Sequence, residues 1–433
     1  MKDDLREILD AGLAAAEPER AIWRTLSLED GAIVAGDHRF EPRRVLVLAV
    51  GKASGAMARA AHELLGEHIS GGLVVTKEGH DSGPEGFDKV FSSHPEPDER
   101  GVEAARRVQE MAESLGEGDL LLALISGGAS ALLADPASDI SLGELKRLTG
   151  DLLRSGADIS EINTVRKHVS TLKGGGLAKL AAPAETLALL LSDVIGDEPS
   201  SIASGLTAPD PTTLDDARGV LRRYGIEPPE SVTRHLETVD ETPKPGDHLF
   251  DKVSNLICGS GWHAAEAAVE RARDLGYTPI LLSTSFTGDA RYAASMYAAV
   301  IREVLASGNP VPPPCAIVGA GELTVTVRGE GTGGPNQEFS LALALALQGV
   351  DGWAAFSMDT DGNDGPTEAA GALVDGGASP AIREGGVDPE EALETNDTNV
   401  ALRAGGALLV TGPTGTNVND LRVALVLDPN DGV

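Results

Sequence analysis

Apolar and polar positions follow two alternating rhythms along the first 240 residues. Short apolar runs bounded by glycine predict buried strands, and longer segments with apolar positions three and four residues apart predict helices. Strands are predicted at 45–50, 72–76, 89–91, 119–125 and 186–191, and helices at 53–65, 98–115 and 142–154, after an amphipathic helix at the N-terminus. This alternation favours a parallel sheet covered by helices on both faces.

A second α/β rhythm follows a segment rich in Pro, Glu and Thr at 228–247. We therefore expect a domain boundary near residue 240, with domains at 1–240 and 241–433. In the second domain, strands are predicted at 254–258, 279–283, 316–319, 323–328, 354–358, 407–410 and 422–427, and helices at 263–275, 290–305 and 337–347. The predicted fold class is α/β in both domains.

Composition narrows the classes of partner. The chain of 433 residues carries 67 acidic and 35 basic side chains, a formal net charge of −32. Such acidity argues against nucleic acid and anionic membranes as partners, because both require basic surfaces. No apolar run reaches the roughly 18 residues of a membrane span, and the N-terminus lacks the long apolar region of a signal peptide. We therefore expect a cytoplasmic protein.

Lysine is scarce, with none after Lys252. An acidic, lysine-poor composition is typical of proteins that work at high salt, where self-repulsion is screened. An ordinary acidic cytosolic protein is the alternative. The two cysteines, Cys258 and Cys315, are too few for a disulfide framework or a cysteine-cluster metal site.

Two glycine-rich turns follow predicted strands. One is Gly51-Lys52-Ala-Ser54-Gly, and the other is Ser126-Gly127-Gly128-Ala-Ser130. Small residues let the backbone approach a phosphate, and a helix start supplies N–H donors to an anion. The first turn lacks the spacing of a Walker A motif. Plain tight turns are the alternative for both.

Basic and acidic side chains lie near the end of the first domain. On a helix, Asn163, Arg166 and Lys167 would share one face, and Lys173-Gly174-Gly175-Gly follows them. In so acidic a chain this basic patch favours an anionic ligand, the alternative being a salt-bridged helix face. Asp193 follows a strand, where a carboxylate can act as a base, ligate Mg²⁺ or cap a helix.

Two segments of the second domain also carry polar groups. Gly319-Ala-Gly-Glu322 follows a strand, and a run of glycines precedes Asn336-Gln337-Glu, which suits a nucleotide contact or a simple hairpin. Three aspartates fall within six residues, and Asp361 and Asp364 could hold a divalent cation. The segment lacks the distal Glu of an EF-hand, and a solvated acidic surface is the alternative.

Taken in this order, the motifs resemble the glycerate 2-kinase family with a C-terminal MOFRL domain, some members of which are named hydroxypyruvate reductase. The resemblance runs from about Leu9 to Leu427, with the MOFRL region at about 313–427. The matching segments are Val50-Gly-Lys-Ala-Ser54, His94-Pro-Glu-Pro97, Ser126-Gly-Gly-Ala-Ser130, Asn163-Thr-Val-Arg-Lys-His168, Lys173-Gly-Gly-Gly176, Ser192-Asp193, Gly319-Ala-Gly-Glu322, Asn336-Gln-Glu338, Thr360-Asp-Gly362, Asp364-Gly-Pro-Thr367, Thr411-Gly412 and Thr416-Asn-Val-Asn-Asp420.

The resemblance implies transfer of the γ-phosphoryl group of ATP to the 2-hydroxyl of D-glycerate, with Mg²⁺ as cofactor. It also implies a Rossmann-like N-terminal domain, a smaller α/β C-terminal domain and an active site in the cleft between them. By position, Lys52 matches the family's catalytic lysine and Asp193 its catalytic aspartate. The remaining expected contacts are with phosphate or ATP at Ser126, Gly127, Gly128, Ser130, Lys173, Gly174, Gly175, Glu322, Asn336 and Gln337, with glycerate at Ser54, Asn163, Arg166 and Lys167, and with metal at Asp361 and Asp364.

One position departs from the family pattern. Many members have Arg in the motif Gly-Gly-Arg-Asn-Gln-Glu, where this chain has Pro335. Arg328, Arg166 and Lys173 are the alternatives for a replacement cation.

Two other functions stay open at this point. A hydroxypyruvate reductase needs a nicotinamide site, yet the chain has no Gly-x-Gly-x-x-Gly followed by an acidic residue about 20 positions on. A phosphosugar-binding regulator would bind its ligand without consuming ATP. The sequence also leaves the oligomeric state open, a homodimer being one alternative.

Overall fold

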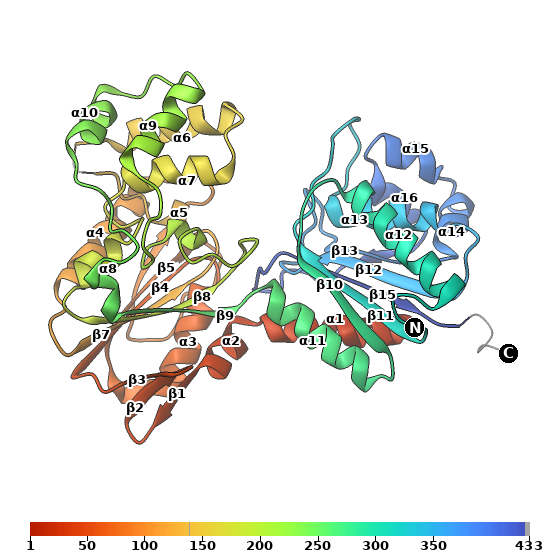
Figure 1. The fold of residues 1–433 in the computed structure, drawn as a ribbon, viewed down its shortest axis with the longest axis horizontal. Coiled ribbons are helices and arrows are strands. Elements are labelled where there is room, and N and C mark those ends of the chain that lie inside the picture. Colours follow the sequence, from red (N-terminus) through yellow and green to blue (C-terminus); the bar gives the residue numbers. More distant parts are fainter. Residues whose placement is uncertain (138, 429–433) are drawn as a thin grey trace. The chain divides into compact units, whose positions relative to one another are not determined.

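The computed structural model describes residues 1–137 and 139–428, which form two compact units (Figure 1). One unit is Pro18–Cys258, and the other joins Met1–Glu17 to Gly259–Val433. The predicted boundary near residue 240 is therefore corrected. Apolar residues of helix α1 (Lys2–Ala16) pack against those of α11 (Gly261–Asp274), which brings the N-terminus into the second unit. Strand β9 (Val253–Gly259), predicted in the second domain, belongs to the sheet of the first unit.

A six-stranded sheet forms the centre of the first unit, in the order β6-β5-β4-β7-β8-β9. The pairings of β4 with β5 and β7, of β5 with β6 and of β7 with β8 are all parallel. Counted from β4, this is the order 3-2-1-4-5-6 of doubly wound nucleotide-binding sheets. The strands are β4 (Arg44–Val50), β5 (Ile69–Lys77), β6 (Asp88–Ser92), β7 (Asp119–Ile125), β8 (Glu185–Leu191) and β9.

Helices cover both faces of this sheet. Leu48 and Val50 of β4 share a core with α4 (Glu99–Glu113) and α8 (Gly176–Ala181). The alternate residues of β4 point to the opposite face, where α3 (Ser54–Leu65) contacts β4 and β5. The N-terminus of α4 is fixed by Asp98, whose carboxylate accepts the backbone N–H groups of Arg100 and Gly101.

The rest of the first unit adds a helical group and a small sheet. Helices α6, α7, α9 and α10 enclose their own apolar core, and lie together in Figure 1. Strands β1, β2 and β3 form an antiparallel sheet. The bounds are α2 (Pro18–Thr25), α5 (Ala129–Leu132), α6 (Leu142–Arg154), α7 (Ile159–His168), α9 (Leu214–Arg223), α10 (Glu230–Thr238), β1 (Leu26–Glu29), β2 (Ala32–Ala35) and β3 (His38–Phe40).

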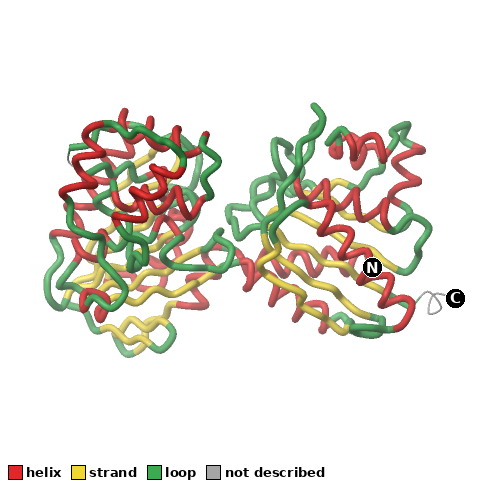
Figure 2. Tube along the Cα trace, turned by 45° about the horizontal axis from the view of Figure 1, so that its top comes forward, coloured by secondary structure: helices red, strands yellow, loops and turns green. Residues whose placement is uncertain are grey.

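The second unit is built on a mixed six-stranded sheet in the order β10-β11-β15-β12-β13-β14. Figure 2 shows the strands of this unit in yellow and its helices in red. Only the β10–β11 pairing is parallel among these described strands. Helices α1 and α11 pack on one face, and α12 and α13 on the other. The bounds are β10 (Thr278–Phe286), β11 (Cys315–Gly321), β12 (Trp353–Asp359), β13 (Gly371–Asp375), β14 (Leu408–Leu409), β15 (Asp420–Val426), α12 (Ala290–Ser307), α13 (Pro335–Ala346), α14 (Ala378–Glu384), α15 (Pro389–Glu394) and α16 (Thr398–Ala404).

The strand predicted at 323–328 is wrong. The backbone of Thr324 instead forms two hydrogen bonds at the start of α12. Thr324 N–H donates to Gly288 O at 2.8 Å, and Ala290 N–H donates to Thr324 O at 2.9 Å. The Arg328 N–H donates to the side chain of Asn396 at 2.6 Å. Within residues 1–137 and 139–428, no helix is both long and apolar enough to cross a membrane.

Candidate active site

The two glycine-rich turns interlock at the carboxyl ends of β4 and β7. Lys52 N–H donates to Gly127 O at 2.9 Å, and Ala53 N–H donates to Ser126 Oγ at 3.1 Å. Gly51 has φ +126°, and a Cβ at this position would lie 2.2 Å from Ser126 Oγ, so only glycine fits. From β4 and β7 the chain continues to opposite sides of the sheet, and such a switch point is where doubly wound sheets bind ligands.

The Ser54 side chain stabilises the Gly51 turn through hydrogen bonds inside the protein. Its side chain is fully buried, and its hydroxyl lies 2.8 Å from Gly51 O and 3.1 Å from Val75 O. The hydroxyl is thus occupied by backbone carbonyls. The expected contact of Ser54 with glycerate stays a prediction.

Three further side chains converge on Gly127 and Gly128 from three different loops. A Cβ at Gly127 would lie 2.1 Å from a carboxylate oxygen of Asp193, which follows β8. A Cβ at Gly128 would lie 3.2 Å from His94 Cδ2, beyond β6, and 3.3 Å from Lys52 Cγ. The paired glycines therefore leave room for these groups, and the sheet topology joins residues that are far apart in sequence.

Burial and charge shift the pKa values of two of these groups. Burial raises the pKa of Asp193, with the positive charge of Lys52 opposing the shift. Burial also lowers the pKa of His94 to about 4, and Lys52, Lys77 and His80 add to this effect. A carboxylate with a raised pKa can accept a proton, and His94 stays uncharged at neutral pH.

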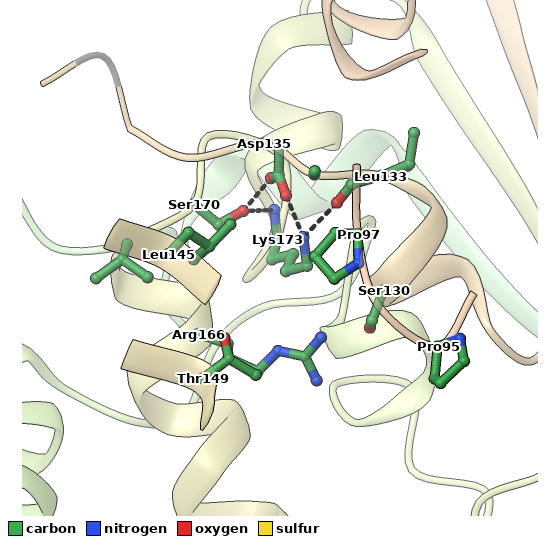
Figure 3. Close-up of a pocket in the computed structure, with 12 residues that line it drawn as sticks. Pro95, Pro97, Ser130, Leu133, Asp135, Leu145, Thr149, Arg166, Ser170 and Lys173 are labelled. Carbon is green, nitrogen blue, oxygen red and sulfur yellow. Dashed lines mark hydrogen bonds and ion pairs between the residues drawn. The ribbon is translucent and has the colours of Figure 1, made fainter. Parts of the chain in front are cut away.

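A small cavity of about 50 Å³ lies beside this cluster (Figure 3). The Arg166 side chain extends across it from α7 toward Ser130. Among the residues that the structure describes, no hydrogen bond or ion pair engages the Arg166 guanidinium, and burial lowers its pKa. An unpaired, partly buried guanidinium is suited to a bidentate interaction with a carboxylate or phosphate. The cavity wall also includes Pro95, Pro97, Leu133, Asp135, Thr149, Ser170 and Lys173.

Lys173 lines the cavity but is not a free cation. Its ammonium is buried, donates to Leu133 O at 3.0 Å and pairs with Asp135. Asp135 also accepts the Leu172 N–H at 2.8 Å. Burial lowers the pKa of Lys173, while Asp135 opposes the shift. The pair indicates a role in shaping the cavity, and the expected contact of Lys173 with ATP stays a prediction.

We expect Lys173→Met to destabilise the first unit by about 3–5 kcal/mol, because it leaves the buried Asp135 carboxylate without its partner. Urea denaturation measures this change. Arg106→Ala, which removes exposed pairs with Glu103 and Glu110, is the matched control and should barely move the midpoint. An equal effect of the two substitutions would contradict a structural role for Lys173.

Other expected ligands of the first unit are also occupied. Lys167 is buried, and its ammonium lies 3.2 Å from Asp210 Oδ1. The N–H groups of Gly174 and Gly175 donate to Ser204 O at 3.0 Å and Gly205 O at 2.7 Å. These donors already have internal acceptors. The expected contacts of Lys167 with glycerate and of Gly174 and Gly175 with phosphate stay predictions.

Asn163 and Ser130 belong to one hydrogen-bonded chain. Ser130 Oγ lies 2.9 Å from Ser204 Oγ, which lies 3.3 Å from Asn163 Oδ1. Ser204 and the preceding Ala203 have φ of 57° and 52°. Left-handed conformations at non-glycine residues often mark functional loops, and this one holds Ser130 beside the cavity.

The expected nucleotide contacts of the second unit lie in a buried internal network. Asp364 caps α13, since its carboxylate accepts the N–H groups of Asn336 at 3.0 Å and Gln337 at 2.9 Å. The Asn336 amide donates to Asp420 Oδ1 at 2.7 Å, and the Gln337 amide to Asp364 Oδ2 at 2.9 Å. The expected contacts of Asn336 and Gln337 with ATP stay predictions. Pro335 is the first residue of α13, a position that suits proline.

The acidic segment does not fit the expected metal site. Both oxygens of Asp364 are engaged at the helix start, and burial raises its pKa to about 6. Asp361 Oδ1 accepts the Asn363 N–H at 2.8 Å. Across residues 1–137 and 139–428, no group of three or more His, Cys, Asp or Glu side chains is arranged to hold a metal ion. Glu322, expected at ATP, is exposed.

Asp359 gives this segment a pH-dependent stability. Burial raises its pKa from 3.8 to about 8, and the charges of Asp420 and Asp361 act in the same direction. The folded state therefore holds a proton that the unfolded state releases. This contribution to stability is fully present below about pH 4 and is lost as the pH rises through about 8.

We therefore expect Asp359→Asn to raise the Tm of the second unit, by an amount that grows from pH 5 to pH 8 and then levels off. The amide keeps an acceptor for the Asp361 N–H, 2.9 Å away in the wild-type protein, but cannot ionise. Thermal unfolding across this pH range tests the expectation. A difference in Tm that does not change with pH would contradict it.

Sequence reasoning missed three residues around the first-unit site. His94 stands in the segment His94-Pro-Glu-Pro97, which follows a strand as Lys52 and Asp193 do, and that position was an available signal. Asp135 lies in a loop without a distinctive pattern, whereas Ser204 lies in the run 199–205, whose small polar residues suit a substrate-lining loop. Their proximity to Lys173 and Ser130 arises from the packing of α7 and the strand ends.

Comparisons with known proteins agree with this architecture. A family model described as a domain of unknown function, DUF4147, matches residues 4–237, and the MOFRL family matches residues 315–420. The chain is 44% identical to the D-glycerate 2-kinase of Thermotoga maritima over 97% of each protein. It is 39% identical to the glycerate 2-kinase of Pyrococcus horikoshii over 98% of each.

An Agrobacterium vitis relative named "Putative hydroxypyruvate reductase" is 42% identical, over 98% of this chain and 94% of its own. A crystal structure of glycerate kinase from Thermotoga maritima superposes with a TM-score of 0.90 at 42% identity, covering 98% of this chain and 99% of that chain. Both the sequence and the fold match nearly end to end, and the chain belongs to the glycerate kinase family that carries a MOFRL domain.

Proposed function

We propose that this protein transfers the γ-phosphoryl group of ATP to the 2-hydroxyl of D-glycerate, giving 2-phosphoglycerate and ADP. The observation that carries the proposal is the convergence of Lys52 and Asp193 on the Gly127–Gly128 turn at the switch point of a doubly wound sheet. The 44% identity to a D-glycerate 2-kinase over nearly the whole chain supports the choice of substrate.

Phosphoryl transfer depends on positioning and on the stabilisation of charge. The Lys52 ammonium has no ion pair or hydrogen bond among the described residues, so it is free to neutralise the transferring group. The N–H groups of Gly127 and Gly128 also donate to no described acceptor, and can hold phosphate oxygens. Asp193, with its raised pKa, accepts the proton of the attacking hydroxyl.

The cavity beside this centre suits the carboxylate of glycerate. Arg166 supplies an unpaired guanidinium, and Ser130 supplies a hydroxyl held by Ser204. A carboxylate held there would orient the adjacent carbon and its hydroxyl toward Asp193. The Asp135–Lys173 pair fixes the wall of the cavity and adds no net charge.

The nucleotide is proposed to enter as its magnesium complex. Magnesium is commonly held by phosphate oxygens, water and one or two carboxylates. Because Asp364 is engaged in capping a helix, the ion is treated as part of the nucleotide substrate and is given no protein ligand. Pro335 stands where many family members have an arginine, and we propose Arg328 of the same unit as the replacement cation, since its guanidinium has no hydrogen bond or ion pair with the described residues.

Two assays in molar KCl test the proposal. ADP formation from ATP should require D-glycerate, whereas NADH should not be oxidised in the presence of hydroxypyruvate. The reverse result would establish the reductase. Binding of sugar phosphates without ATP consumption in either assay would favour the regulator.

A further inference from the structure

The segment that carries His94 connects the two parts of the proposed site. On one side, the His94 ring lies beside Lys52 Cγ at the Gly128 turn, as the contacts of a Cβ at Gly128 show. On the other side, the next residues of the segment, Pro95 and Pro97, line the cavity that contains Arg166 (Figure 3). His94 therefore lies close to Lys52 in space and directly precedes, in sequence, a residue that lines the cavity with Arg166.

His94 has unused hydrogen-bonding capacity at this point. It is partly buried, and neither ring nitrogen has a hydrogen-bond partner within residues 1–137 and 139–428. The charged and titratable groups that face it are Lys52, Lys77 and His80, which together with burial keep the ring neutral at physiological pH. A neutral imidazole offers one N–H donor and one nitrogen acceptor.

Glycerate presents three polar groups, and two are already accounted for. Its carboxylate faces Arg166, and its 2-hydroxyl faces Asp193. The remaining group is the 3-hydroxyl, which can donate and accept one hydrogen bond each, as a neutral imidazole can. A charged side chain at this position would match a second anion better than it would match an alcohol.

We propose that His94 binds the 3-hydroxyl of glycerate and so distinguishes glycerate from 2-hydroxy acids that lack this group. The inference rests on the proposed function, because it uses the placement of the carboxylate and the 2-hydroxyl. Sites built to hydrogen-bond a substrate hydroxyl discriminate strongly against analogues without it, because their buried polar groups are then left unpaired.

D-Lactate is the matched probe, since it keeps the carboxylate and the 2-hydroxyl and replaces the hydroxymethyl group by methyl. The measured quantities are kcat/KM for D-glycerate and for D-lactate, and the inhibition constant of D-lactate against D-glycerate. His94→Ala should lower kcat/KM for D-glycerate by roughly 100-fold and change both D-lactate values less than about 3-fold. His94→Gln keeps a neutral donor and acceptor and should recover most of the preference.

His248→Ala is the control for loss of a histidine, because His248 is exposed and, among the described residues, its ring pairs only with Asp251. Equal losses on glycerate and lactate in His94→Ala would overturn the proposal, since His94 would then act on the phosphoryl group or on the fold. An unchanged preference for glycerate would overturn it as well. If the wild-type protein does not phosphorylate glycerate, the proposed function itself is refuted. The wild-type activity is therefore measured before any variant is compared.

Discussion

Replacing Lys52 by alanine is expected to lower kcat by about 10³-fold while the protein stays folded. Stabilisation of the transferring phosphoryl by a positioned cation accounts for effects of this size. The fold should be kept because the ammonium makes no described ion pair or hydrogen bond, whereas the backbone of Lys52 carries the contact to Gly127. The loss should appear mainly in kcat, because the charge is needed most in the transition state.

Lys89→Ala is the matched control. Lys89 is exposed on β6 in the same unit, and its removal changes the net charge equally. Steady-state kinetics and the thermal unfolding midpoint should be measured for both variants. Near-wild-type turnover in Lys52→Ala would contradict the catalytic role of Lys52. Equal losses of kcat in both variants would show that total charge is responsible.

Replacing Asp193 by asparagine should also lower kcat by about 10³-fold, because the amide cannot accept the hydroxyl proton. The pH profile gives a second test. Asp193 acts as a base only when ionised, and burial raises its pKa above the ordinary value. The wild-type rate should therefore fall as the pH drops through this raised pKa, and the residual rate of the asparagine variant should lack that dependence.

Asp37→Asn is the control for this substitution, since Asp37 is exposed in the turn between β2 and β3. It should keep both the rate and the pH profile of the wild-type protein. An Asp193→Asn variant with the wild-type acid limb would indicate that another group is the base.

Much of the first unit could be predicted from the sequence because local patterns dictate it. The buried strand at 119–125 and the helix at 142–154 were predicted with the bounds that the structure has. The Gly51 and Ser126 turns were predicted at strand ends, and the parallel order then brings strand ends to one edge. The strand order that sets β4 beside β7 came only with the structure.

The roles of the basic residues could not be predicted, because they depend on distant partners. Lys52, Lys167 and Lys173 look alike in sequence, each standing in or beside a glycine-rich or basic motif. Asp210 and Asp135, which pair with the latter two, lie 43 and 38 residues away along the chain. Burial of both pairs gives these two lysines internal partners and leaves Lys52 and Arg166 unpaired.

In the second unit, too, the partner of a predicted ligand-binding motif depends on tertiary contacts. Asn336 and Gln337 follow a run of glycines, which predicts a phosphate-binding helix start. The structure fills that helix start with the protein's own anion, Asp364. An internal carboxylate satisfies the same N–H donors as a phosphate does, and only tertiary contacts reveal which of the two is present.

The regiochemistry of the product tests the whole account most directly. If Arg166 holds the carboxylate, His94 the 3-hydroxyl and Asp193 the attacking oxygen, the phosphoryl group must reach the 2-position. Phosphorus NMR of the product formed from ATP and D-glycerate in molar KCl distinguishes the two isomers. The account predicts 2-phosphoglycerate, and a product that is only 3-phosphoglycerate would contradict it.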